Sequence, residues 1–246
     1  MRGIVLVSVF ALAAAAAAEE EKEAKAGLTP EERQLRMLTA TGGLLTAPAE
    51  GGALLVLDMT GGRAGATVAE TAALLGSVLK VSTASEARKP PRGGDPSAEI
   101  RAALGAKGVA AVVAVVADKG RPALLVAPED RWAAVNAAKI LDAGGGAPEV
   151  RLRKEIWRAA GFMMGAGSTG APQCPFRPVL APADLDAFTG FQLAPATLAA
   201  VSAYAKAAGI AQPRQTTYRK ACEQGWAPAP TNDFQRAIWD ELKGNK

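Results

Sequence analysis

Two uninterrupted apolar runs constrain the fold of this chain more than any other feature. Residues 53–57 read Ala-Leu-Leu-Val-Leu and end at Asp58, and Val109–Val116 contains only valine and alanine. Runs of this length without alternating polar residues are typical of strands that are buried on both faces. Because such strands need helices above and below them, the chain is expected to form a layered α/β structure.

Helical patterns and turns lie between and after these runs. Weaker strands are predicted at 78–81 and 122–126, and the second is expected to form an antiparallel hairpin or a tight corner with 109–116. A helix is predicted to follow Pro128 and to run to about Leu141. The expected architecture is α/β (α+β), with a mixed sheet of about four strands packed with helices. A single domain is predicted over 49–246, with a helical C-terminal segment from about 183 to 246.

The first 18 residues have the parts of a secretory signal peptide. Arg2 precedes an apolar stretch from Ile4 that ends with the small residues Ala16 and Ala18. The stretch is short for a membrane span, which needs about 20 residues. We therefore expect cleavage after Ala18, with a retained anchor as the alternative. Residues 19–48 are predicted to be a flexible N-terminal arm. The mature protein is expected to be periplasmic or secreted and to have no membrane span.

The charges argue against a nucleic-acid partner. The chain has 28 Lys and Arg against 24 Asp and Glu, and the two signs are interspersed. A nucleic-acid binder usually carries a basic stripe with aromatic residues along it, and the short cationic stretches at 88–92 and 151–154 form no such stripe. An unidentified peptide, protein or glycan is the expected partner.

The chain has two cysteines, Cys174 and Cys222. In an oxidising compartment such a pair tends to close, so a disulfide between them is expected if the protein is exported. Two free thiols are the alternative.

The chain has no histidine, and this excludes several kinds of catalysis. A Ser-His-Asp or Cys-His arrangement cannot form, and neither can the common histidine-rich zinc sites. No metal or other cofactor is therefore expected. Carboxylates remain as candidate catalytic groups. Asp58 and Glu129 both lie at predicted strand ends and could in principle form the acid pair of a glycosidase.

One helical segment resembles the zinc-binding helix of the metzincin peptidases. Residues Lys154 to Met164 can be laid over the pattern His-Glu-x-x-His-x-x-Gly-x-x-His, in which Glu155 matches the general base and Gly161 matches the glycine at the helix end. Lys154, Arg158 and Met164 then occupy the three ligand positions. The later segment from Cys174 to Pro178 resembles the region after this helix in the archaemetzincin branch, with Phe176 where a methionine might be.

This resemblance implies a degenerate archaemetzincin-like scaffold that has lost its zinc ligands. Two cations cannot ligate zinc, and a lone glutamate has no metal-bound water to activate. Together with the signal-like N-terminus, the resemblance leads us to expect an exported, non-catalytic protein with a metallopeptidase-like fold that acts by binding or as an envelope component. Glu155 and Arg158 are the candidate binding residues. The alternative is a carboxylate-based hydrolase, peptidase-like or glycosidase-like, that uses Glu155 or the pair Asp58 and Glu129.

The C-terminal segment is unusually aromatic for this chain. Tyr218, Trp226, Phe234 and Trp239 lie close together in sequence. Two interpretations remain open. The residues either form a recognition surface for a peptide or sugar, or they pack back onto the domain as part of its core.

Overall fold

The computed structural model shows that the chain forms two compact units. One contains residues up to Ala47 together with those from Gln215 onward, and the other runs from Pro48 to Arg214. The chain thus divides after Arg214. The sequence instead predicts a single domain over 49–246. The predicted signal peptide and most of the predicted arm lie outside the described residues, which are 42–47, 50–91, 95–118, 120–144, 146–169, 174–188, 190 and 193–244.

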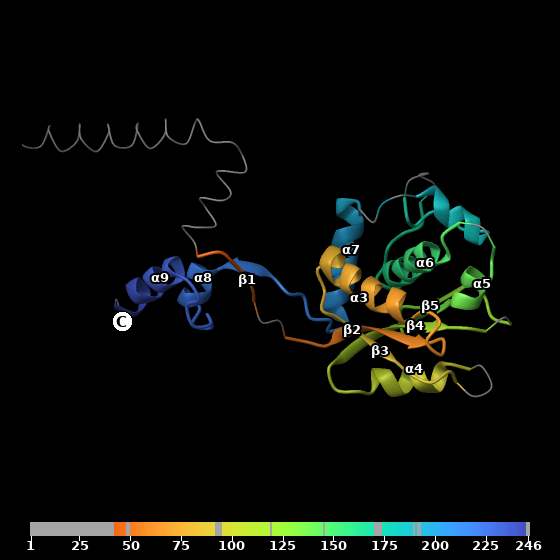
Figure 1. Ribbon diagram of the computed structural model, residues 1–246, viewed down its shortest axis with the longest axis horizontal. Coiled ribbons are helices and arrows are strands. Elements are labelled where there is room, and N and C mark those ends of the chain that lie inside the picture. Colours follow the sequence, from red (N-terminus) through yellow and green to blue (C-terminus); the bar gives the residue numbers. More distant parts are fainter. Residues whose placement is uncertain are drawn as a thin grey trace, which may run out of the picture. The chain divides into compact units, whose positions relative to one another are not determined.

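The large unit is built on a mixed five-stranded sheet, and the predicted α/β class is confirmed (Figure 1). The strand order is β3-β2-β4-β6-β5. β5 pairs antiparallel with β6, while the other neighbours pair in parallel. The bounds are β2 Ala53–Met59, β3 Thr83–Ala87, β4 Val109–Val116, β5 Leu124–Ala127 and β6 Trp132–Asn136.

The structure corrects the predicted neighbours of β4. β4 and β5 do not form a hairpin, because β6 lies between them and pairs with both. β6 falls in the region predicted as helix, and only its end continues as the short helix α5 (Ala137–Leu141). The strand predicted at 78–81 is the end of helix α3 (Gly65–Leu79) and the turn after it, and β3 begins at Thr83.

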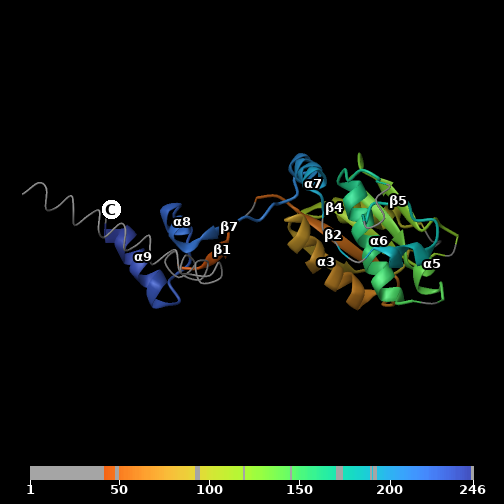
Figure 2. The same cartoon turned by 90° about the horizontal axis from the view of Figure 1, so that it is seen from above.

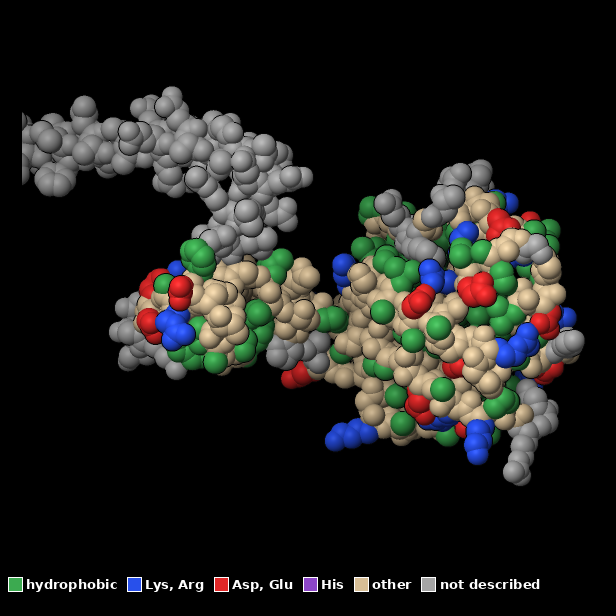
Figure 3. Space-filling view, in the orientation of Figure 1, with side chains coloured by type: hydrophobic (Ala, Val, Ile, Leu, Met, Phe, Trp, Pro, Cys, Tyr) green, Lys and Arg blue, Asp and Glu red, His purple; other side chains and the backbone are tan. Residues whose placement is uncertain are grey.

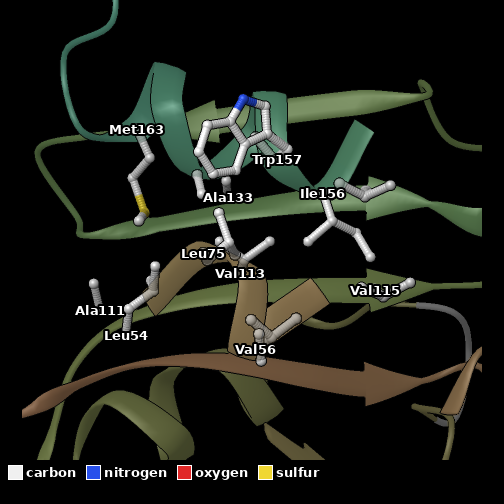
Figure 4. Packing of buried hydrophobic residues seen from close by; sticks show 14 of the residues in the cluster. Leu54, Val56, Leu75, Ala111, Val113, Val115, Ala133, Ile156, Trp157 and Met163 are labelled. Carbon is white, nitrogen blue, oxygen red and sulfur yellow. The ribbon is translucent and has the colours of Figure 1, made fainter. Parts of the chain in front are cut away.

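Helices cover the sheet on both sides, as the apolar runs predict. Helix α4 (Ser97–Leu104) lies on one face, whereas α3, α6 (Pro148–Met163) and α7 (Pro195–Ala207) lie on the other (Figures 1 and 2). β4 contributes alternate residues to the two cores, so that Val113 and Val115 face α3 and α6 while Val112 faces α4. Figure 4 shows the larger core, where Ile156 and Trp157 of α6 pack near Val113 of the sheet.

The small unit joins the two ends of the described chain. β1 (Leu44–Thr46) pairs antiparallel with β7 (Gln215–Thr217), which leads into helix α8 (Tyr218–Glu223) and later into α9 (Asp233–Gly244). Residues 42–47 of the predicted arm are therefore part of a folded unit. The Gln235 side chain donates a hydrogen bond to the carbonyl of Gly42 at 2.9 Å. The aromatic C-terminal segment packs mainly within this unit, where Tyr218 is buried and Phe234 is 58% exposed.

The predicted disulfide is not formed, and Cys174 and Cys222 are both free thiols. Cys174 belongs to the large unit and Cys222 to the small one. Each of the two residues is partly buried.

The described surface is mixed in charge. On the face of the large unit shown in Figure 3, Lys and Arg side chains lie interspersed with Asp and Glu. Across the described residues, no helix has both the length and the apolar character needed to cross a bilayer.

Candidate functional site

Helix α6 carries the residues of the predicted site, and its chemistry is divided between two faces. Pro148 and Glu149 begin the helix, where proline fits the first turn and an acid favours the positive end of the helix dipole. The apolar face packs on the sheet. A second face carries Arg151, Lys154 and Arg158 together with Glu155, at spacings of three and four residues that place them in one row. All four are no more than 7% exposed.

Residues 174–188 cover this row, and we call them the strap. The strap includes the 3-10 helix η2 (Pro182–Ala187), which contacts α6. Its apolar side chains Phe176, Leu185 and Phe188 are at most 1% exposed. Because the strap lies over the charged row, the face of α6 that carries Glu155 and Arg158 is closed to solvent.

Two cations of α6 hold the strap through its backbone. Arg158 donates from Nη1 to the carbonyl oxygens of Pro175 at 2.8 Å and Arg177 at 2.6 Å. Lys154 donates from Nζ to the carbonyl of Leu185 at 2.8 Å. The Lys154 ammonium also lies 4.9 Å from the centre of the Phe188 ring, within cation–π range. Burial lowers the pKa of Lys154, and the nearby Asp186 carboxylate opposes this shift.

A third cation binds a strap side chain. Arg151 donates to both carboxylate oxygens of Asp186, with Nη2 2.6 Å from Oδ2 and Nε 3.0 Å from Oδ1. Such a two-pronged pair is the preferred geometry between a guanidinium and a carboxylate. The hydrogen bonds from Arg151 hold the pKa of Asp186 below its ordinary value. The three cations thus fix the strap on either side of η2 and within it.

Glu155 is closed off from solvent and paired within the helix. Its Oε2 lies 2.9 Å from Nε of Arg158, and both side chains are about 5% exposed or less. Burial raises the pKa of Glu155, and Arg158 opposes this with its charge. The Glu155 carboxylate thus balances the charge of Arg158, which binds the strap carbonyls.

Gly161 and Met164 do not occupy the roles implied by the resemblance. Helix α6 continues through Gly161 and ends at Met163. Gly161 is required here because the Phe176 ring packs against it, so that a Cβ at this position would lie 2.2 Å from a ring carbon. The Met164 side chain is fully buried in the core between the helices and the sheet. The third ligand position is therefore filled by a core residue.

The residues of α6 do not fit a zinc ion. The ligand positions 154 and 158 carry cations whose donors are engaged by carbonyl oxygens, and the chain has no histidine. Among the described residues, no cluster of three or more Cys, Asp or Glu side chains could hold a metal. No catalytic step through a metal follows from this arrangement.

The structure does not bring Asp58 and Glu129 together. Asp58 lies at the carboxyl end of β2, in register with Val115 of β4, which pairs with Val135 of β6. Glu129 is exposed in the turn before β6, at the opposite end of the parallel strands and two strands away. The two therefore lie more than roughly 10 Å apart, given about 3.3 Å per strand residue. Paired glycosidase carboxyls lie roughly 5–9.5 Å apart. Asp58 is 2% exposed and accepts hydrogen bonds from the backbone and hydroxyl of Thr60.

Comparison with solved structures identifies the scaffold. The chain is similar to an archaemetzincin from Methanopyrus kandleri, with a TM-score of 0.51 and 16% identity over 63% of this chain and 96% of that one. This chain has the archaemetzincin fold. The predicted resemblance is confirmed at the level of the fold, which at this identity is all that the likeness shows.

Two further solved structures are more distantly similar. They are a zinc-dependent peptidase from Methanocorpusculum labreanum (TM-score 0.47, 12% identity, 60% of this chain and 99% of that one) and an archaemetzincin from Archaeoglobus fulgidus complexed with malonate (TM-score 0.44, 13% identity, 60% and 98%). No family model and no curated protein matches the sequence.

The sequence predicted part of this archaemetzincin-fold site and missed the rest. Glu155 and Arg158 do lie together, but as a buried pair and not along an open cleft. The strap contacts were missed, because the groups that Lys154 and Arg158 bind are backbone carbonyls, which have no residue signature. The cationic stretch 151–154 was the available signal, since buried-face cations on an amphipathic helix require partners.

We predict that replacing Gly161 with alanine destabilises the large unit by about 1–3 kcal/mol or more, because the added methyl group overlaps the Phe176 ring. Thermal unfolding measures the effect. Gly167→Ala is the matched control, since nothing lies within 4 Å of a Cβ there. Equal melting temperatures for the two variants would show that Phe176 does not pack as described.

We also predict a pH-dependent effect of Glu155→Gln. Burial raises the folded-state pKa of Glu155 above the unfolded value of about 4.3. The folded protein therefore keeps this proton to a higher pH than the unfolded chain. Its contribution to stability is largest below the unfolded pKa and is lost as the pH rises through the folded pKa. Glutamine cannot ionise, so the variant should gain stability relative to the native protein as the pH rises from about 4.

Melting temperatures measured at several values between pH 4 and pH 7 test this expectation. Glu149→Gln serves as the control, because Glu149 is exposed in the first turn of the same helix. A difference between Glu155→Gln and the native protein that shrinks with rising pH contradicts the assigned shift.

Proposed function

We propose that this protein is exported and acts by binding or as an envelope component, without catalysis, on its metallopeptidase-like fold. The observation that carries the proposal is the use of positions 154 and 158. Where a metzincin places two zinc ligands, Lys154 and Arg158 instead donate hydrogen bonds to carbonyl oxygens of the strap. These bonds hold the strap over Glu155, the residue that the resemblance assigns as general base.

A carboxylate-based hydrolase has less support. Glu155 is 3% exposed and paired with Arg158, so neither water nor substrate has access to it. Asp58 lies at the carboxyl end of β2, whereas Glu129 precedes the amino end of β6, two strands away. A peptide, protein or glycan ligand therefore has to bind at a surface other than the row of charges on α6.

Metal analysis tests the non-catalytic proposal. The protein is purified from an exporting host, equilibrated with zinc, separated from free metal and assayed for bound zinc and for hydrolysis of a mixed peptide library. We expect substoichiometric zinc and no hydrolysis, because the ligand positions hold cations. One zinc per chain together with peptide hydrolysis that Glu155→Gln abolishes would overturn the proposal.

The export part of the proposal predicts a defined N-terminus. Protein recovered from the periplasm or the medium is expected to begin at Glu19, because Ala16 and Ala18 form the small-residue cleavage site. N-terminal sequencing measures this directly. In the control Ala18→Leu, processing should be impaired. Recovery of native chains that still begin at Met1, either in the membrane fraction or in the cytoplasm, would refute cleavage and export respectively.

A further inference from the structure

One buried carboxylate oxygen lacks the partner that its position requires. Asp58 is 2% exposed, and its Oδ1 accepts hydrogen bonds from the amide of Thr60 at 2.9 Å and from the Thr60 hydroxyl at 2.6 Å. Its Oδ2 is also buried, but it has no hydrogen-bond partner among the described residues. A buried carboxylate oxygen without a donor is costly, so this atom calls for an explanation.

The unpaired oxygen lies beside the start of helix α3. Gly65 is the first residue of α3, and a Cβ built there would lie 3.5 Å from Oδ2 of Asp58. Apart from the backbone of α3 and the residues next to Gly65, no other described atom would lie within 4 Å of that Cβ. Gly65 itself is partly exposed. The glycine therefore leaves room beside Oδ2 at a point that borders the solvent.

The same helix start offers hydrogen-bond donors. The first amides of a helix have no acceptor within the helix, and they carry the positive end of its dipole. Helix α3 has no side-chain cap at its N-terminus and no acid in its first turn. The Thr60 hydroxyl accepts from the amide of Ala64, the residue before the helix, at 3.0 Å. A group bound over Gly65 would thus meet amide donors on one side and a carboxylate acceptor on the other.

The place of Asp58 in the sheet agrees with a ligand site. From β2 the chain passes through α3 to β3 on one side of β2, and then through α4 to β4 on the other side. The two helices cover opposite faces of the sheet (Figure 1). In open α/β sheets, ligands bind outside the carboxyl ends of the strands at the point where the strand order reverses. Asp58 lies at the carboxyl end of β2, where this reversal occurs.

We propose that Asp58 and the first turn of α3, which we call the Asp58 site, bind a hydroxyl group of a carbohydrate. The positive helix end disfavours a cation there, and the carboxylate disfavours an anion. A hydroxyl group is neutral, and it can donate to Oδ2 of Asp58 while it accepts from an α3 amide.

The choice of a carbohydrate follows from the competition with water. A single hydroxyl group gains little on binding, because it exchanges hydrogen bonds with water for hydrogen bonds with protein. A ligand for the Asp58 site therefore needs several hydroxyl groups, as a sugar has. The inference rests on the proposed function, because it names the class of ligand that the non-catalytic protein binds.

Gly65→Ala tests whether a hydroxyl group serves Oδ2 of Asp58. Alanine in place of glycine ordinarily stabilises a helix. At Gly65, however, the added methyl group takes the room beside Oδ2 and keeps every donor from it, water included. We therefore expect Gly65→Ala to lower the melting temperature of the ligand-free protein by about 1–3 °C.

Gly105→Ala is the matched control. Gly105 is the C-cap of α4 and has helical dihedral angles (φ −79°, ψ −10°), and a Cβ there would also lie 3.5 Å from an oxygen, the carbonyl of Arg101. This variant should raise the melting temperature by about 1–3 °C, the usual effect of the substitution. Equal rises for Gly65→Ala and Gly105→Ala would overturn the proposal.

Saturation-transfer NMR tests the class of ligand. Protein from an exporting host is mixed in turn with glucose, galactose, mannose and N-acetylglucosamine, and any sugar that binds is titrated. We expect binding of at least one sugar, which Gly65→Ala and Asp58→Asn each weaken about tenfold, the effect of losing one hydrogen bond to a charged group. Asparagine keeps an acceptor for Thr60 and replaces Oδ2 with a donor. Gly105→Ala should leave the affinity unchanged.

Two results of the titration would overturn the proposal. One is that none of the four sugars binds, since the Asp58 site then holds water only. The other is binding that Asp58→Asn leaves unchanged. Neither result alters the zinc and hydrolysis measurements, so the two proposals fail separately.

Discussion

The arrangement of the predicted site depends on the hydrogen bonds from α6 cations to strap carbonyls. Buried cations are costly unless each finds a partner. Arg158 meets this requirement with two carbonyls and Glu155, and Lys154 with one carbonyl and an aromatic ring. The strap in turn is held over the helix and closes the charged face of α6 to solvent. The charged row on α6 therefore holds the strap in place, within a scaffold that has the archaemetzincin fold.

The sequence predicted those elements in which pattern and environment agree. The apolar runs at 53–57 and 109–116 became β2 and β4, which are buried on both faces. β6 was missed, because Trp132 to Val135 contains two alanines, which favour helix when isolated. Burial between β4 and β5 overrides that preference. β3 was also missed, since its residues Thr83 to Ala87 are mostly exposed and carry no apolar signature.

For the candidate site, the sequence likewise predicted the scaffold but not the contacts that α6 makes with distant segments. The register of Lys154 to Met164 on the metzincin pattern correctly indicated the scaffold. It could not indicate that Phe176 packs on Gly161, nor that Met164 enters the core, because both depend on how α6 meets distant segments. The disulfide prediction failed for a similar reason. Pairing of Cys174 with Cys222 was expected from an oxidising compartment alone, and the fold places the two residues in separate units as free thiols.

The pairing of β1 with β7 has a consequence for the order in which the chain folds. The large unit is continuous in sequence and is complete once Arg214 has been made. The small unit combines residues 42–47 with residues from Gln215 onward, so it cannot assemble until nearly the last residue is available. During synthesis from the N-terminus, residues 42–47 are made before the large unit but find their partner strand only after that unit is complete. This long-range closure makes the small unit the last part of the protein to form.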